Sequence, residues 1–183
     1  MRETKQNAPF SLTSAVFLLK LCTESGGEWQ KVAESGMEML FGEYVNTLDD
    51  KGRIQFPAKL RAALREDALV VTQGLDRCLM IFPPEEWMAL NEKIVGSASL
   101  FSDQKRLVMR RFIAPAQKLS FDKSGRLSIP QTLREYAGLK GECTILGINR
   151  YIELWDAKSY REYLERTEDS FQQAAETMSG ILF

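Results

Sequence analysis

The sequence predicts a mainly β fold with peripheral α-helices, in which two copies of one unit are related by a pseudo-twofold axis. The composition of the 183 residues, 44% hydrophobic and 27% charged, is typical of a globular domain. The stretch Leu48–Pro57 returns, shifted by 73 residues, as Phe121–Pro130. A unit of about 40 residues is too small to bury an adequate core, so the two copies should share one.

The repeat continues without a gap from Leu48 to Phe82 in the first copy, which indicates a duplicated structural unit. The matched residues include charged, glycine and proline positions as well as apolar ones. The identical pairs are Asp49 and Asp122, Gly52 and Gly125, Arg53 and Arg126, Pro57 and Pro130, Leu60 and Leu133, Arg61 and Arg134, Gly74 and Gly147, and Arg77 and Arg150.

Each copy predicts a strand, a tight turn at Asp-x-x-Gly and a return strand, together forming a hairpin. The return strands Arg53–Phe56 and Arg126–Ile129 alternate polar and apolar residues, which is typical of half-buried strands. The repeated arginine therefore lies just after the turn, on the solvent side. Proline then ends each strand and opens the short helices predicted over 57–64 and 130–137.

The tandem Asp-x-x-x-Arg motifs, each followed by proline, a short helix and a second hairpin, resemble the MraZ transcriptional regulators. The opening stretch Met39–Tyr44 adds to this resemblance, which extends to about Tyr160. It implies two AbrB-like swapped-hairpin units in one double-split β-barrel. It also implies assembly into rings and binding to DNA repeats upstream of a division and cell-wall gene cluster.

The chain divides into five predicted segments. These are an N-terminal extension (1–38), a first AbrB-like unit (39–83), linking helices (84–115), a second unit (116–156) and a C-terminal helix with its tail (157–183). Residues 1–36 have no counterpart in the repeat. They are read as a disordered leader, a short amphipathic helix or a targeting segment, or else translation starts at Met37 or Met39.

Local signals place the other elements. The runs Ala68–Thr72 and Cys78–Phe82 predict a second hairpin, whose counterpart follows in the second copy. Pro84 opens a helix, and Ser102 or Asp103 can cap another that runs through Phe112. Asp156 can cap a long polar helix to about Met178.

Arg53 and Arg126 are the candidate DNA contacts, because a guanidinium beside a tight turn can reach phosphates or the edge of guanine. Lys51 and Lys123, in the same turns, can add phosphate contacts. The motif is supported by Asp49, Gly52, Asp122 and Gly125. The structural alternative is an ion pair between each aspartate and arginine, within one turn or across a subunit boundary.

Charge is distributed unevenly along the chain. A formal net charge of −1 and a pI near 5.7 are unusual for a general nucleic-acid binder, so any DNA-binding surface must be local. Residues 102–134 contain eight basic and two acidic residues, a balance of +6, whereas residues 135–183 have a balance of −4. Three of those basic residues can contact DNA or the acidic C-terminal helix of another subunit: Arg106, Arg110 and Arg111.

Catalytic, cofactor and metal sites are not expected. The chain has no histidine, no phosphate-binding loop and no nucleophile elbow. Cys22, Cys78 and Cys143 lack metal-ligand spacing and are predicted to be free thiols. The predicted function is a cytoplasmic, nucleoid-associated repressor that binds double-stranded promoter direct repeats as a ring-shaped homo-oligomer and does not involve a membrane. The alternative is a ring-forming assembly protein or an antitoxin-like protein-binding module.

Overall fold

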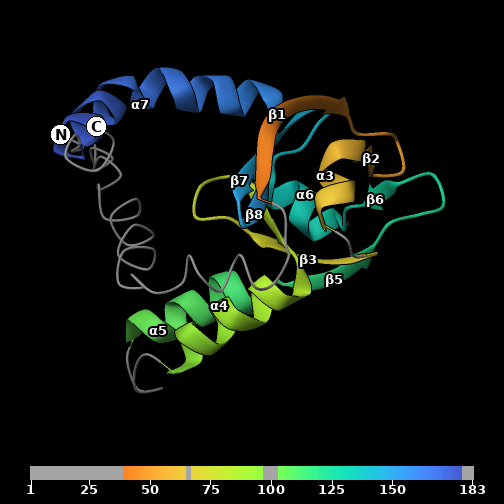
Figure 1. Cartoon of the computed structure of the whole chain (residues 1–183), viewed down its shortest axis with the longest axis horizontal. Coiled ribbons are helices and arrows are strands. Elements are labelled where there is room, and N and C mark those ends of the chain that lie inside the picture. The colour runs from red at the N-terminus through yellow and green to blue at the C-terminus, as the bar shows by residue number, and fades with distance from the viewer. Residues whose placement is uncertain (1–38, 65–66, 97–102, 179–183) are drawn as a thin grey trace, which may run out of the picture. The chain divides into compact units, whose positions relative to one another are not determined.

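The computed structural model describes residues 39–64, 67–96 and 103–178, and the predictions for residues 1–38, including Cys22, lie outside them (Figure 1). The described elements are β1 (Leu40–Thr47), β2 (Arg53–Gln55), α3 (Ala58–Leu64), β3 (Ala68–Gln73), β4 (Leu79–Phe82), α4 (Pro84–Gly96), α5 (Asp103–Val108), the π-helix η1 (Met109–Ile113), β5 (Gln117–Ser120), β6 (Arg126–Ser128), α6 (Gln131–Ala137), β7 (Glu142–Asn149), β8 (Tyr151–Asp156) and α7 (Ala157–Thr177). A mainly β fold with peripheral helices is therefore confirmed.

The strands form a six-stranded antiparallel sheet, in the order β1-β7-β8-β4-β3-β5, and a two-stranded ribbon of β2 and β6. Ile54 pairs with Leu127, and Met80 pairs with Glu153. The members of each pair are 73 residues apart, so the pseudo-twofold axis passes through both places. Because β1 pairs with β7 and β5 with β3, the strands of the two copies interleave as predicted.

The two Asp-x-x-Gly turns form as predicted, but the prediction that the strands on either side of each turn pair with each other as a hairpin is wrong. Among the described residues, strand pairing between the two arms of each turn is limited to the isolated bridges Leu48 to Ile54 and Phe121 to Leu127. The arms then separate, since β1 pairs along its whole length with β7, and β2 pairs with β6. Pairing with the other copy gives β1 eight register positions, which a three-residue return strand could not supply.

The core lies between the six-stranded sheet and the ribbon, and both copies contribute to it. Ile54 and Leu127 point inward from the ribbon and are fully buried. Leu60 of α3 and Leu133 of α6 are buried in the same cluster. Burying an aliphatic side chain of this size contributes about 1.5 to 3 kcal/mol. The shared core explains why neither copy closes alone.

A second apolar cluster lies under α4, which runs beside α5 in Figure 1. Trp87, Leu90 and Ile94 form the stripe of α4 and pack with Phe82 and Phe112. The helix predicted through Phe112 ends as α-helix at Val108 and continues as the π-helix η1. The wider turn is visible in the bond from the Ala114 amide to the Met109 carbonyl.

The ends of the other helices agree with the sequence to within one residue. Pro130 occupies the N-cap position of α6, just outside the helix, instead of its first turn. Asp156 caps α7 as predicted, because its carboxylate accepts a hydrogen bond from the Ser159 amide at 3.0 Å. Cys78 and Cys143 are buried free thiols, in agreement with the prediction.

Candidate nucleic-acid interface

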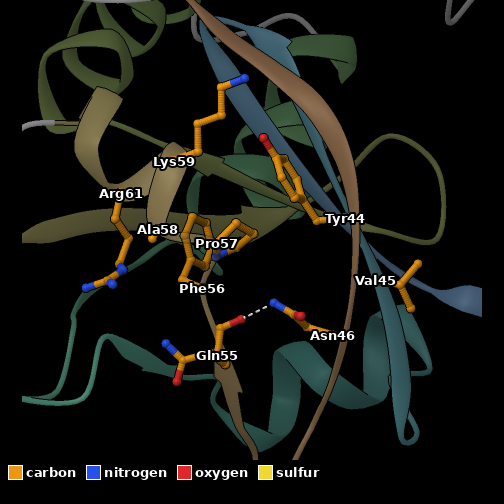
Figure 2. Close-up of a pocket in the computed structure, with 9 residues that line it drawn as sticks. All are labelled: Tyr44, Val45, Asn46, Gln55, Phe56, Pro57, Ala58, Lys59 and Arg61. Carbon is orange, nitrogen blue, oxygen red and sulfur yellow. Dashed lines mark hydrogen bonds between the residues drawn. The ribbon is translucent and has the colours of Figure 1, made fainter.

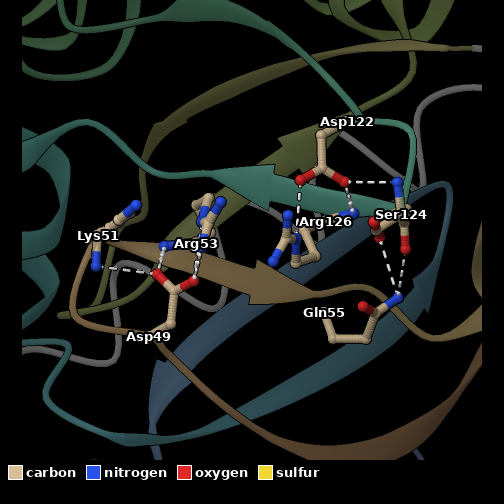
Figure 3. Close-up of polar contacts among 8 residues, drawn as sticks. Asp49, Lys51, Arg53, Gln55, Asp122, Ser124 and Arg126 are labelled. Atoms are coloured by element: carbon tan, nitrogen blue, oxygen red, sulfur yellow. Dashed lines mark hydrogen bonds and ion pairs between the residues drawn. The ribbon is translucent and has the colours of Figure 1, made fainter.

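The first turn is closed by the carboxylate of Asp49. Its Oδ1 accepts hydrogen bonds from the backbone amides of Lys51 at 3.0 Å and Arg53 at 2.9 Å. Its Oδ2 accepts from Arg53 Nε at 2.8 Å and forms an ion pair with Nη2 at 2.7 Å. One aspartate therefore fixes both the backbone of the turn and the direction of the arginine (Figure 3).

The second turn repeats this geometry with other neighbours. Asp122 Oδ1 accepts from the amides of Ser124 and Arg126, both at 2.9 Å. Its Oδ2 accepts from Arg126 Nε at 2.7 Å. The alternative of an ion pair within each turn is therefore realised in both copies. These pairs orient the arginines, and the same arginines can still contact DNA through their other N–H donors.

The ribbon brings the two turns together on one surface. Gln55 is paired with Arg126, and Arg53 with Ser128, so all four side chains lie on the face opposite the buried Ile54 and Leu127. Arg53 and Arg126 are diagonal neighbours, which places them roughly 7 to 8 Å apart. Gln55 Nε2 also donates to the Ser124 carbonyl at 3.1 Å and so joins the two copies (Figure 3).

Both guanidinium groups retain unused hydrogen-bond donors. About a third of each side chain is exposed, 29% for Arg53 and 33% for Arg126. A guanidinium has five N–H donors. Within the part of the chain that the structure describes, the aspartates take two donors of Arg53 and one of Arg126. The remaining donors can bind a phosphate or the O6 and N7 atoms of guanine.

Electrostatics favour the charged state of both pairs. The side-chain hydrogen bond from Arg53 lowers the pKa of Asp49 from its usual 3.8 to about 2. Hydrogen bonds from the Arg126 backbone, and then from its side chain, lower the pKa of Asp122. The bond between Asp49 and Arg53 also raises the pKa of Arg53, with a smaller contribution from the Asp122 charge. The two turns are therefore electrostatically linked across the ribbon.

We expect Asp49→Asn to lower the thermal midpoint at neutral pH, by an amount that becomes smaller as the pH falls toward 2. Because the folded pKa of Asp49 lies below its usual 3.8, the contribution of the carboxylate is complete above about pH 4 and is lost as the pH falls through about 2. Thermal melts of both proteins from pH 2 to 7 measure this. Asp50→Asn, an exposed neighbour in the same turn, is the control, and a constant difference at every pH would contradict the prediction.

Two further arginines reach these turns, and sequence reasoning assigned them no role. The guanidinium of Arg134 lies against Gly52, and that of Arg61 lies against Gly125, so each crosses to the turn of the other copy. Both glycines have φ of +74°, and a Cβ at Gly125 would lie 2.3 Å from Arg61 Nη1. The signal that could have found these arginines is their identity at matching repeat positions.

The Nε atoms of Arg61 and Arg134 are buried and have no hydrogen-bond partner among the described residues. Both side chains are only partly buried as a whole. Their charge therefore adds to the same surface as Arg53 and Arg126. Four arginines, two from each copy, surround the ribbon.

The other residues predicted to contact DNA lie partly in the two turns and partly in the helical segment between the copies. Lys51 and Lys123 are exposed within the two turns. Arg106 on α5 pairs with Asp103, whereas Arg110 and Arg111 are exposed on η1. These three arginines belong to the helical segment between the two copies, whereas the ribbon is built from strands within the copies.

Shallow grooves flank the start of α3. Figure 2 shows the groove between β1 and the end of β2, where Tyr44, Gln55 and Lys59 line the opening and Asn46 Nδ2 donates to the Gln55 carbonyl at 2.6 Å. A second groove runs beside Arg61 and Lys123 along the other turn. Both are open to solvent and carry basic groups, so they can border a phosphate backbone.

The described residues contain no group of three or more His, Cys, Asp or Glu side chains that could hold a metal ion. Among the helices in the described part of the chain, none has the length and apolar character needed to cross a membrane.

Comparison with known proteins agrees with the duplicated architecture. The model of the MraZ protein family, whose description calls it putative antitoxin-like, matches residues 39–111 and again 112–181. The transcriptional regulator MraZ of Treponema denticola is 53% identical over 142 residues, which cover 78% of this chain and 99% of the relative. The proteins of that name from Treponema pallidum (strain Nichols; 44% over 140 residues, 76% of this chain and 94% of the relative) and Halothermothrix orenii (43% over 143 residues, 78% and 99%) are also similar. The chain therefore belongs to the MraZ family.

Proposed function

We propose that this protein is a transcriptional regulator that binds double-stranded DNA through the outer face of the β2–β6 ribbon. The observation that carries the proposal is the placement of Arg53 and Arg126, one from each copy, on a single exposed face with unused donors. The names of the relatives support regulation of transcription. Arg61, Arg134, Lys51 and Lys123 supply further positive charge around this face.

In this proposal the protein is cytoplasmic and nucleoid-associated, and it represses the division and cell-wall gene cluster to which its own gene belongs. It binds direct repeats in the promoter as a ring-shaped homo-oligomer. A ring repeats its DNA-facing surface by rotation, which suits direct repeats better than palindromes. Assembly also compensates for the near-neutral charge of one protomer, because linked modules bind with a high effective concentration.

An antitoxin-like or purely structural assembly role is the second candidate, favoured by the description of the family. In that case the Asp-x-x-x-Arg motifs would serve subunit contacts. Both aspartates, however, are already paired with the arginine of their own turn inside one chain. The motifs thus do not need a second subunit to satisfy their charges, which weighs against this alternative.

The number of DNA repeats tests the proposal directly. Affinity should be measured by fluorescence anisotropy on duplexes that carry one, two or three copies of the repeat found upstream of the gene, with scrambled duplexes of equal length. We expect affinity to rise steeply with the number of repeats, by about a hundredfold or more between duplexes with one repeat and duplexes with three. Equal affinity for one and three copies, or for scrambled DNA, would contradict the proposal.

Gly125→Ala is expected to weaken DNA binding several-fold, because a Cβ there displaces the guanidinium of Arg61. Gly138→Ala is the matched control, since Gly138 also has a positive φ, +64°, but has open space around its Cβ position. Both variants should lose about 1 to 2 kcal/mol of stability from the backbone alone, because an L-residue is strained at a positive φ. Anisotropy and thermal melts compare them, and equal affinities for both variants would argue against a role for Arg61.

A further inference from the structure

The helices that follow the two copies are themselves repeated. A shift of 73 residues places Trp87, Leu90 and Ile94 of α4 on Tyr160, Tyr163 and Thr167 of α7. In α4 this stripe is covered by the next helical segment of the chain, through Val108, Phe112 and Ile113. Helix α7 is the counterpart of α4, but no described residue takes the place of α5 and η1 beside it.

The stripe of α7 is covered only at its beginning within the described part of the chain. Tyr160 and Tyr163 pack on Trp155, with ring centroids 5.6 and 4.9 Å apart. The same face continues through Leu164, Thr167 and Phe171, which follow at helical spacing. Leu164 is 46% and Phe171 68% exposed. A long helix with an exposed apolar stripe of this kind has a surface suited to a partner.

The charges around this stripe indicate what the partner carries. Residues 161–177, which span the stripe, contain five acidic and two basic residues, and from Glu168 to Thr177 there are three acidic residues and no basic one. Packing α7 against α7 of a second copy would bring these acids together, which costs free energy. A basic surface with an apolar residue at its centre is the better complement.

Such a surface is present on the same chain. Leu107 is 57% exposed at the end of α5, and Arg110 and Arg111 follow on η1 at i+3 and i+4, so the three share a face. Neither arginine forms an ion pair among the described residues, and both are exposed. The side of this segment that carries Val108 and Phe112 is already packed against α4.

We propose that the exposed stripe of α7, formed by Leu164, Thr167 and Phe171, docks on the Leu107–Arg111 face of a second copy of this chain. The two surfaces differ, so the contact is head to tail and can close a ring. The inference rests on the ring assembly in the proposed function and names its contact. It also assigns Arg110 and Arg111 to subunit pairing instead of DNA.

Phe171→Asp in the full-length chain tests the apolar part of the contact. Size-exclusion chromatography with light scattering should give the mass of a multimer for the wild type and about one protomer, 20.8 kDa, for the variant. Gln173→Asp, on the opposite side of α7, is the control and should keep the wild-type mass. The proposal would be overturned if the wild type had the mass of a single protomer, or if Phe171→Asp kept the mass of the wild-type multimer. Circular dichroism checks that the exposed substitution leaves the fold intact.

Disulfide trapping identifies the two surfaces that meet. Leu107→Cys and Phe171→Cys in one chain should give a ladder of linked multimers under oxidation, at least tenfold more than either single variant or the wild type. If Phe171→Cys alone cross-links as well as the pair, α7 meets α7 and the proposal is wrong. If neither cross-links above the wild type, it is also wrong.

Binding of DNA separates this inference from the proposed function. A wild-type multimer that has no preference for its own upstream DNA would refute the proposed function and leave the α7 contact standing. A wild type that binds its DNA specifically while Phe171→Asp keeps the full mass would refute the contact alone.

Discussion

Alanine at Arg53 and alanine at Arg126 are each expected to weaken binding to the upstream DNA by about tenfold to a hundredfold. The two residues occupy equivalent places beside the pseudo-twofold axis of the ribbon, so their effects should be similar in size. Several protomers in one assembly multiply the loss, since every subunit carries the substitution. Fluorescence anisotropy at one fixed salt concentration measures both variants.

Arg77→Ala is the matched control, because Arg77 is exposed in the β3–β4 connection and lies outside the ribbon. Its removal should change affinity by less than about threefold through the loss of general charge. Light scattering must give the same mass for all three variants. If Arg77→Ala weakens binding as much as Arg53→Ala, the ribbon is not the contact surface.

Gly147→Ala is expected to produce a large loss of stability, about 2 to 3 kcal/mol. Gly147 is paired with Gly42 where β1 joins β7. A Cβ at Gly147 would lie 2.7 to 2.9 Å from the backbone atoms of Leu40 and Phe41, which cannot move without separating the strands. Chemical denaturation followed by tryptophan fluorescence measures the change in free energy of unfolding.

Gly96→Ala provides the comparison, because a Cβ at the end of α4 would have no neighbour within 4 Å. We expect a change within about 0.5 kcal/mol of the wild type. The contrast tests the pairing of β1 with the other copy. Equal stability of Gly147→Ala and Gly96→Ala would mean that β1 does not lie against β7 in this register.

Much of this fold could be predicted because its signals are local or repeated. The alternation of Arg53, Ile54 and Gln55 predicts which side chains face solvent, and the cap at Asp156 predicts the start of α7. The pairing of strands could not be predicted in the same way. A strand next to a turn pairs with its neighbour by default, whereas here β1 finds its partner about a hundred residues away in β7.

The candidate site could be predicted only where its contacts are local in sequence. The aspartate–arginine pair is encoded four residues apart, so its geometry follows from one turn. The crossing of Arg61 to Gly125 depends on how the copies fold together, and no local pattern encodes it. The π-helix after Val108 likewise depends on packing Phe112 under α4 and has no sequence mark.

The most direct test of a DNA-binding ribbon is the salt dependence of binding for wild type and Arg53→Ala. Anisotropy on the upstream DNA and on a scrambled duplex gives the slope of log affinity against log salt concentration, which falls by about 0.9 for each phosphate that the protein no longer neutralises. We predict a steep slope and a preference for upstream DNA in the wild type. The variant should bind more weakly, with a smaller slope or a weaker preference, at an unchanged assembly mass. Equal affinity, slope and preference for both proteins would contradict the account.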